Sequence, residues 1–176
     1  MAHSVQMNFI ASLKRNFPRF FEFQKVLEVG SLDINGSVRG FFENCQYLGI
    51  DIGPGPGVDF VCNGAEFDPP FQFDVVLSCN MLEHNPQWKE TLQNMQKIAK
   101  KALFITVPGP GFPEHGTLQN DIDCAPHQSA MGWEEYYQNL DISDLLSALD
   151  LSEFSDVYIR RLDIDVLFYG IKKEIV

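Results

Sequence analysis

The chain has 176 residues, of which 45% are hydrophobic and 21% charged, a composition typical of one globular domain and not of a disordered segment. Its 24 Asp and Glu residues against 13 Lys and Arg residues give a formal net charge of −11. Because binding to a phosphate backbone needs clustered basic residues, these scattered cations argue against a nucleic-acid partner.

Targeting and membrane signals are also missing from the sequence pattern. The longest uncharged apolar stretch, Val75 to Leu82, is far shorter than the roughly 20 residues that a membrane-spanning helix needs. Polar residues interrupt any apolar run before Lys14, so no signal peptide is expected. The four cysteines form no CxxC pair. We therefore expect a cytoplasmic chain with reduced thiols and no membrane partner.

The first half of the chain is expected to alternate between helices and strands. An amphipathic pattern predicts a helix over Val5–Phe23, in which Pro18 stops the apolar repeat. The elements predicted after it are a strand at Lys25–Gly30, a short helix at Gly36–Phe42, a strand at Tyr47–Ile52, a rigid turn at Gly53–Gly57 and a short strand at Val58–Cys62.

The second half continues the alternation. Asn85 suits the N-cap of a helix and Pro86 its first position. The other predicted elements are strands at Asp74–Cys79 and Ala102–Val107, a long polar loop at Phe112–Gly132, a helix capped by Asp141 or Ser143, and a hairpin of Phe154–Leu162 and Val166–Lys172. The pattern predicts an α/β fold: a Rossmann-like, seven-stranded, mostly parallel sheet with a C-terminal antiparallel hairpin and helices on both faces.

A glycine-containing turn follows the first predicted strand. The segment from Glu28 to Gly36 keeps only two glycines of the dinucleotide-binding pattern, Gly30 and Gly36. Glycines let the backbone approach a ligand closely, and the N-terminus of the following helix would present free N–H groups to it. Taken alone, this segment is equally compatible with an ordinary strand-to-helix turn.

Asp51 strengthens the interpretation as a binding site. It comes at the end of the second strand, about 20 residues after the turn, where an acid can bind both hydroxyls of an adenosine ribose. Glu28 and Asp33 would place negative charge where a pyrophosphate would lie. A cationic or zwitterionic adenosyl ligand therefore fits this turn better than NAD does.

Four segments in order resemble the class I S-adenosylmethionine-dependent methyltransferases, and most closely a small bacterial group known as type 11. They are EVGSLDINGSVR at Glu28–Arg39, YLGIDIGPGPGVD at Tyr47–Asp59, FDVVLSCNMLEH at Phe73–His84 and PEHGT at Pro113–Thr117. The resemblance covers about Lys25 to Leu140. It implies S-adenosylmethionine as the cofactor and S-adenosylhomocysteine as the product.

The resemblance implies cofactor contacts at eight positions: Glu28, Gly30, Ser31, Asp51, Ile52, Asn63, Cys79 and Asn80. The turn at Gly30 would lie beside the methionine part of the cofactor, and Asp51 would bind the ribose. Ile52 would pack on the adenine ring, and Asn63 stands where the family usually has an Asp that binds the adenine amino group. The last two positions end the fourth strand, where the family lines the methyl-transfer side.

Two histidines are the candidate catalytic residues. The resemblance places His84 at the mouth of the methyl site, where an imidazole can take a proton from a hydroxyl. A structural or helix-capping role is the alternative for this histidine. His115, in the PEHGT segment, is expected to face the substrate. Residues 115–127 contain further His, Asp and Cys residues, but their spacing matches no metal motif, so no metal is expected.

We expect an enzyme that transfers the methyl group to a small-molecule or glycan acceptor, with an oxygen as the acceptor atom. The main alternative is a non-catalytic adenosyl-cofactor-binding or interaction protein, because Leu32 and Asp33 replace the family's usual third glycine. A nicotinamide oxidoreductase on a similar fold is a further alternative, since fold alone does not decide function. The oligomeric state is left open.

The expected organisation is a single methyltransferase-like domain over residues 1–176. Residues 1–23 would form the N-terminal helix, residues 25–107 the cofactor-binding core and residues 108–133 a substrate loop. This loop starts at the carboxyl edge of the sheet, where ligands bind in such folds. We therefore expect it to cover the acceptor site and to be more mobile than the sheet, with Trp133, Tyr136 and Tyr137 as a pocket wall or as core residues.

Overall fold

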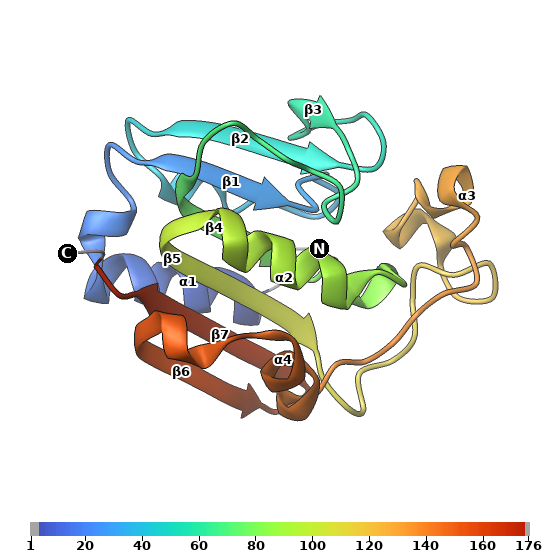
Figure 1. Cartoon of the computed structure of the whole chain (residues 1–176). Helices are drawn as coiled ribbons and strands as arrows, with labels where there is room; N and C mark the ends of the chain where they lie inside the picture. Colours follow the sequence, from blue (N-terminus) through green and yellow to red (C-terminus); the bar gives the residue numbers. More distant parts are fainter. Residues whose placement is uncertain (1–3, 175–176) are drawn as a thin grey trace.

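The computed structural model describes residues 4–174 and contains a seven-stranded sheet in the order β3-β2-β1-β4-β5-β7-β6 (Figure 1). The strands are β1 (Lys25–Val29), β2 (Gln46–Asp51), β3 (Phe60–Val61), β4 (Phe73–Cys79), β5 (Ala99–Pro108), β6 (Phe154–Leu162) and β7 (Asp165–Lys172). The first five pair in parallel, whereas β7 runs antiparallel to both β5 and β6. The predicted α/β fold class is confirmed.

Helices cover both faces of the sheet. The α-helices are α1 (Ser4–Asn16), α2 (Trp88–Ile98), α3 (Gln128–Met131) and α4 (Ile142–Ala148), and the 3-10 helices are η1 (Pro18–Phe20), η2 (Arg39–Phe41), η3 (Leu82–His84), η4 (Ile122–Cys124) and η5 (Leu151–Glu153). None of the helices within residues 4–174 is long and apolar enough to cross a membrane.

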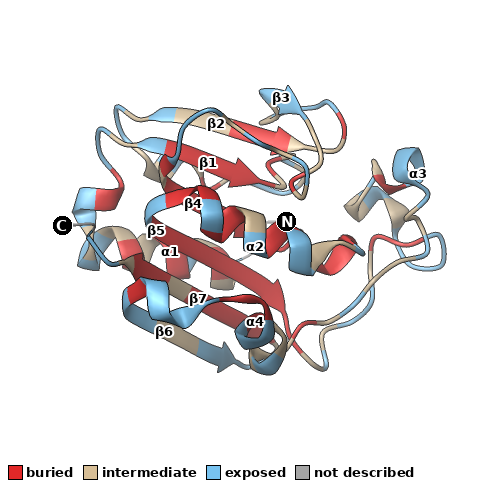
Figure 2. Ribbon diagram, in the orientation of Figure 1, coloured by how far each residue is buried: buried red, intermediate tan, exposed pale blue. Residues whose placement is uncertain are grey.

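Two apolar clusters hold these layers together. On one face, Leu92 and Met95 of α2 and Leu145 of α4 pack with alternate residues of the central strands. On the other face, Ile10 and Leu13 of α1 pack against the remaining residues of the same strands. β4 and β5 are therefore buried on both sides (Figure 2). This explains why their sequences are nearly continuous apolar runs.

The first helix is shorter than the amphipathic pattern predicts. α1 ends at Asn16, and only the 3-10 turn η1 follows before β1. Pro18 is the physical reason, because a proline ring disfavours a helical conformation in the residue before it. Phe17 accordingly has a φ of −135° and a ψ of 56°. The first three residues of the predicted segment 1–23 lie outside the described part of the chain.

The helix predicted at Gly36–Phe42 is wrong, since only the 3-10 turn η2 forms there. Local side chains compete for the backbone donors. The Asp33 carboxylate accepts a hydrogen bond from the N–H of Gly36 at 2.8 Å, and the Ser37 hydroxyl accepts one from the N–H of Arg39 at 3.1 Å. Such bonds stabilise turns at the expense of a helix. Within residues 4–174, no α-helix therefore lies between β1 and β2 after the glycine turn.

The helix after β4 starts later than Asn85 and Pro86 predict. α2 begins at Trp88, with Gln87 in the N-cap position. Asn85 instead closes a turn, because its Oδ1 accepts a hydrogen bond from the N–H of Gln87 at 2.8 Å. Its Nδ2 donates to the Thr91 hydroxyl at 2.8 Å, which ties this turn to the helix.

The C-terminal elements agree with the sequence prediction. Asp141 caps α4 in a capping box with Asp144: each side chain accepts a backbone hydrogen bond from the other end of the first turn. The strands β6 and β7 form the predicted antiparallel hairpin. They add an antiparallel edge to the parallel sheet and leave the carboxyl ends of β1, β2 and β4 open for a site.

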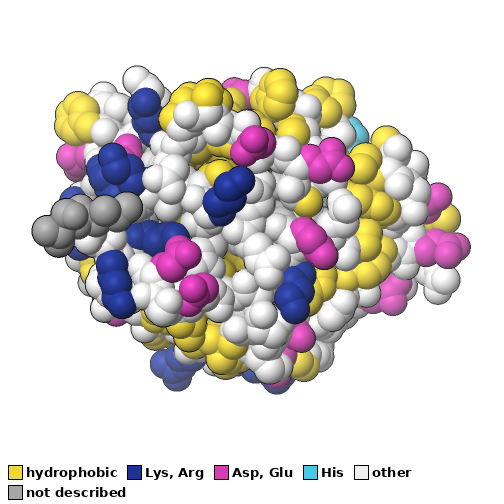
Figure 3. All heavy atoms as spheres, in the orientation of Figure 1, with side chains coloured by type: hydrophobic (Ala, Val, Ile, Leu, Met, Phe, Trp, Pro, Cys, Tyr) yellow, Lys and Arg dark blue, Asp and Glu magenta, His cyan; other side chains and the backbone are white. Residues whose placement is uncertain are grey.

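Several basic side chains form local ion pairs. The Lys101 ammonium lies 2.9 Å from the Asp74 carboxylate, and the Lys97 ammonium lies 3.5 Å from that of Asp68. On the face drawn in Figure 3, Lys and Arg side chains lie among Asp and Glu side chains.

Candidate functional site

A cavity lies at the carboxyl ends of β1, β2 and β4. It contains about 670 Å³ of empty space, part of it open to solvent. Six of the residues singled out from the sequence line it: Gly30, Asp51, Ile52, Asn63, Asn80 and His84. The remaining four, Glu28, Ser31, Cys79 and His115, lie outside its lining.

Part of the 108–133 loop forms the opposite wall of the cavity. Residues 124–128 and Trp133 line it. In Figure 1 this segment, coloured yellow to orange, lies beside the arrowheads of β1, β2 and β5. The His127 ring lies so close to Gly53 that a Cβ atom on this glycine would be 2.2 Å from His127 Cγ. The loop therefore closes over the edge of the sheet that carries Asp51.

Gly30 makes the turn after β1 possible. Its φ is +82°, a conformation that residues with a side chain rarely adopt. The N–H groups of Gly30 and Ser31 both donate to the carbonyl of Ile50, at 2.9 and 3.1 Å. A Cβ atom at Gly30 would be 2.3 Å from the Cβ of Met81. The glycine thus lets the backbone and the Met81 side chain share one narrow space at the cavity.

Asp51 ends β2 with its carboxylate held by backbone donors. Its Oδ2 accepts a hydrogen bond from the N–H of Leu32 at 3.2 Å, so it also fixes the glycine turn. Burial raises the pKa of Asp51, while backbone hydrogen bonds from Leu32, Ile52 and Gly53 act in the opposite direction. The result is an oriented acid at the place where an adenosine ribose binds in doubly wound sheets.

Asn63 lies farther along the cavity wall, after β3. Its Nδ2 donates to the Oε1 of Gln87 at 2.7 Å, and its Oδ1 accepts from the N–H of Ala65 at 3.1 Å. Both ends of this amide are therefore oriented by the protein. Gln87 was not singled out from the sequence, because its contact with Asn63 depends on how the turn before α2 folds.

Cys79 and Asn80 end β4 and point in different directions. Asn80 lines the cavity with a φ of +46°, a left-handed conformation that asparagine tolerates better than most residues. Its Oδ1 accepts a hydrogen bond from the Thr106 hydroxyl at 3.0 Å. Cys79 is buried in the cluster beneath α1, and this burial raises the pKa of its thiol to about 12.

Glu28 and Ser31 lie behind the glycine turn. Side chains alternate along a strand, so Glu28 points to the face covered by α1 whereas Val29 lines the cavity. Its Oε2 accepts a 2.7 Å hydrogen bond from the Tyr47 hydroxyl, and burial raises its pKa to about 7. The Ser31 side chain packs against Gly49. Negative charge from Glu28 is therefore not presented to the cavity.

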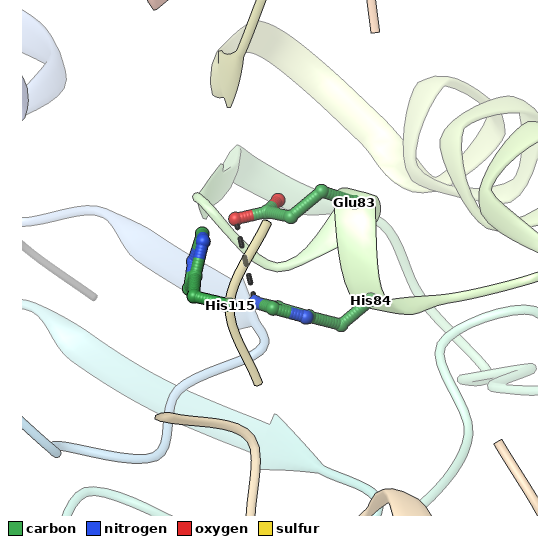
Figure 4. A group of neighbouring side chains, drawn as sticks. All are labelled: Glu83, His84 and His115. Atoms are coloured by element: carbon green, nitrogen blue, oxygen red, sulfur yellow. Dashed lines mark ion pairs between the residues drawn. The ribbon is translucent and has the colours of Figure 1, made fainter. Parts of the chain in front are cut away.

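A second group of polar side chains lies next to the cavity: Glu83 and His84 of η3, and His115 of the loop (Figure 4). Their ligating atoms all lie within 4.8 Å of one another, and Oε1 of Glu83 is 3.7 Å from Nε2 of His84. Burial raises the pKa of Glu83 to about 8 and lowers that of His84 to about 3, where nearby His115 also contributes. His84 is thus neutral in this environment.

Tyr137 completes this group. Its ring centroid lies 5.5 Å from that of His84 and 5.0 Å from that of His115. Burial raises the pKa of its phenol, and the charge of Glu83 adds to this shift. The sequence identified Tyr137 only as a wall or core residue and did not single out Glu83. An adjacent Glu-His pair in a turn is a signal that could have found the latter.

The histidines of the 108–133 loop diverge. His115 packs against His84, with ring centroids 4.8 Å apart, whereas His127 lies over Gly53. Within residues 4–174, the group of Glu83, His84 and His115 is the one arrangement of His, Cys, Asp and Glu side chains that could hold a metal ion. The polar residues of this loop therefore lie at two ends of the cavity and do not form one cluster.

No protein-family model matches this sequence, and a search among curated proteins finds no match either. Solved structures do match. One is a Burkholderia thailandensis 1,6-didemethyltoxoflavin N1-methyltransferase with S-adenosylhomocysteine bound: its TM-score is 0.61 at 16% identity, over 95% of this chain and 77% of that one.

Two further matches agree with the first. A Haemonchus contortus phosphoethanolamine N-methyltransferase 2 gives a TM-score of 0.64 at 16% identity, over 95% of this chain and 53% of that one. The N-terminal domain of EvdMO1, solved in the presence of S-adenosylhomocysteine and D-fucose, gives a TM-score of 0.62 at 17% identity. The match covers 98% of this chain and 85% of that one. The chain therefore has the fold of the class I S-adenosylmethionine-dependent methyltransferases, as the resemblance of its motifs predicted.

Proposed function

We propose that the protein is a methyltransferase that uses S-adenosylmethionine and releases S-adenosylhomocysteine. The observation that carries this proposal is the oriented Asp51 carboxylate beside the Gly30 turn, on one wall of a cavity at the carboxyl edge of the sheet. Asp51 is the one Asp or Glu among the described residues that line the cavity, so an adenosyl ligand there would meet the ribose-binding acid and no second carboxylate. Three matched structures carry this cofactor or its product.

The cofactor would be held by groups at the ends of four strands, β1 to β4. Gly30 and Asn80 would contact the methionine part, Asp51 the ribose, and Ile52 and Asn63 the adenine. Three further residues would support the backbone turns that contact the cofactor, because they pack beneath these turns without lining the cavity: Glu28, Ser31 and Cys79. When bound, S-adenosylmethionine supplies an already reactive methyl group, so the chain mainly has to align the acceptor with it.

The acceptor would enter between η3 and the 108–133 loop. We place His84 and His115 on this side, with a small molecule or glycan as the acceptor and an oxygen as the acceptor atom. The neutral imidazole of His84 can accept a hydrogen bond from an acceptor hydroxyl. The matched structures include one solved in the presence of a sugar and one with a heterocyclic acceptor. We place the reaction in the cytoplasm, without nucleic acid or membrane as partner.

Titration calorimetry with S-adenosylmethionine, S-adenosylhomocysteine and NAD tests the cofactor assignment. We expect both sulfur compounds to bind and NAD to bind far more weakly, because no Lys or Arg is among the described residues that line the cavity. Comparable affinity for NAD would instead support an oxidoreductase.

A non-catalytic binding protein is the second candidate, because Leu32 lines the cavity where the family's third glycine would leave more room. Transfer of a labelled methyl group to a panel of hydroxyl- and amine-bearing acceptors separates the two. Tight binding of S-adenosylhomocysteine without transfer to any acceptor would favour the second candidate.

A further inference from the structure

The strand β6 forms one edge of the sheet. It is last in the strand order and, among the described strands, pairs with β7 alone (Figure 1). The strand at the opposite edge, β3, has two residues, whereas β6 has nine and contains no proline. A long open edge pairs readily with a further strand, so proteins usually shorten or cover such edges. Of the two edges, β6 is therefore the one that can accept another strand.

Exposed apolar side chains gather around this edge. Every residue of β6 after Phe154 is exposed or half-buried (Figure 2). Val157 and Leu162 of β6 are 36% and 46% exposed, and Leu151 of η5 and Leu146 of α4 are each 39% exposed. The turn η5 directly precedes β6, and α4 packs against it. Apolar surface beside an open strand edge is typical of a contact with another protein.

Two opposite charges stand symmetrically around Tyr158 in the middle of β6. Asp156 and Arg160 lie on the same face of the strand as Tyr158, because side chains alternate between the faces. Asp156 accepts a long hydrogen bond of 3.4 Å from the Tyr169 hydroxyl, and Arg160 stands opposite Leu167 of β7. Neither forms an ion pair with another residue among those described.

We propose that β6 pairs antiparallel with β6 of a second copy of this chain, around a two-fold axis at Tyr158. In a symmetric pair of identical antiparallel strands, residues at equal distances before and after the axis stand directly opposite each other. Asp156 of each copy then faces Arg160 of the other, so the axis relates two ion pairs. On the other face of the strand, Val157 meets Ile159 of the second copy.

The charges select this register over its neighbours. An axis at Val157 or Ile159 leaves Asp156 and Arg160 opposite uncharged residues, and an axis at Arg160 places two arginines opposite each other. Opposite charges directly across two strands stabilise the pair, whereas like charges destabilise it. The charged side chains of β6 therefore do not simply block its edge, because in one symmetric register they complement each other.

The proposed interface lies away from the cavity. Two strands, β5 and β7, separate β6 from β4, the nearest strand whose end borders the cavity. The two sheets would join into one continuous sheet, with the cavities on the outer parts of the dimer. The proposal therefore does not depend on the proposed methyltransferase function.

Analytical ultracentrifugation of the full chain over a concentration series tests the dimer. We expect the wild type to reach twice the monomer mass reversibly. Asp156→Arg and Arg160→Asp should each weaken the dimer about tenfold or more, because each substitution creates two like-charge pairs across the axis. An equimolar mixture of these two variants should form heterodimers, and the double variant D156R/R160D should dimerise by itself, because both arrangements restore opposite charges.

The controls separate this register from a general effect of charge. Lys89→Glu changes the net charge as much as Arg160→Asp does, but on the exposed surface of α2, and its dimer should match that of the wild type. Asp156→Arg makes the net charge of −11 less negative, so general repulsion between copies predicts a stronger dimer where we expect a weaker one. Both substituted β6 positions are exposed, and circular dichroism checks that each variant folds.

Three results would overturn the proposal. The first is a wild type that stays monomeric at every concentration. The second is a dimer that the two charge reversals leave unchanged, or that Lys89→Glu weakens as much as they do. The third is failure of both the mixture and the double variant to dimerise, since the register requires each of them to recover the two ion pairs.

Discussion

The buried Glu28 makes a sharp prediction about stability and pH. Its side chain is 5% exposed, and its pKa in the folded chain is about 7 against an ordinary value of 4.5. The unfolded chain therefore releases this proton at a lower pH than the folded chain does. Below about pH 4.5 both states are protonated and Glu28 has no effect on stability; between pH 4.5 and 7 it increasingly destabilises the fold, and above pH 7 the loss is complete.

Glu28→Gln should remove this pH dependence. Gln is neutral at every pH and keeps an oxygen that can accept the Tyr47 hydrogen bond. Linkage with pKa values of 4.5 and 7 gives a stability gain of the variant over the wild type that is about 2.5 kcal/mol larger at pH 8 than at pH 5. The amide donors of Gln cost about 1–2 kcal/mol when buried without partners, but this cost is the same at both pH values.

The assay is urea unfolding followed by circular dichroism at pH 5, 6, 7 and 8. The quantity of interest is the difference between the unfolding free energies of variant and wild type, because other acids affect both proteins equally. Asp68→Asn is the matched control: this carboxylate is highly exposed, so its substitution tests whether removing an acid from the surface produces the same change. Parallel stability curves for Glu28→Gln and wild type would refute the reasoning.

Four further substitutions test other parts of the structure. Asp51→Ala should weaken S-adenosylhomocysteine binding in calorimetry by about 1–3 kcal/mol, through loss of hydrogen bonds to a charged acceptor, and unchanged affinity in a folded variant would contradict the ribose role. Gly30→Ala should weaken the same ligand and lower the thermal unfolding temperature, because the left-handed turn and Met81 both reject a Cβ. His115→Ala should slow methyl transfer while S-adenosylhomocysteine affinity stays nearly constant, since this residue is outside the cavity lining; loss of both together would speak against that division. Asp141→Ala should destabilise the fold by about 1 kcal/mol in chemical unfolding, from loss of the α4 cap, and an unchanged unfolding midpoint would argue against the cap.

The strands could be predicted from the sequence, because buried parallel strands have short apolar runs between glycines and prolines. The segment Asp74–Cys79 is an example: it lies within β4 and is buried on both faces. Helix boundaries were less accessible. At Gly36–Phe42 the balance between a helix and a turn depends on two side-chain hydrogen bonds, from Asp33 and Ser37, that a periodic pattern does not show.

For the candidate site, the sequence predicted the positions of some residues correctly and missed others. Residues that end strands, such as Asp51 and Asn80, are placed by topology, so their positions at the cavity follow from the order of elements. Side chains alternate between the two faces of a strand, and this rule would have placed Glu28 on the face opposite to that of Val29. The sequence analysis did not apply it to Glu28. Glu83 was missed although it stands next to His84, because the fold and not the local sequence brings His115, far along the chain, beside this pair.

One loop brings the two ends of the cavity together. Residues 124–128 of this loop line the cavity, and His127 covers Gly53 close to Asp51, while His115 of the same loop meets Glu83 and His84. Gln128 ties the segment to the carbonyl of His84, and a hydrogen bond from the N–H of Gly116 to the carbonyl of Asp121 closes it on itself. Because these contacts belong to one short connected segment, we expect a shift at the Gly53 end of the loop to displace its His115 end as well. Under the proposed function, this one loop would bring a cofactor and an acceptor to the same edge of the sheet.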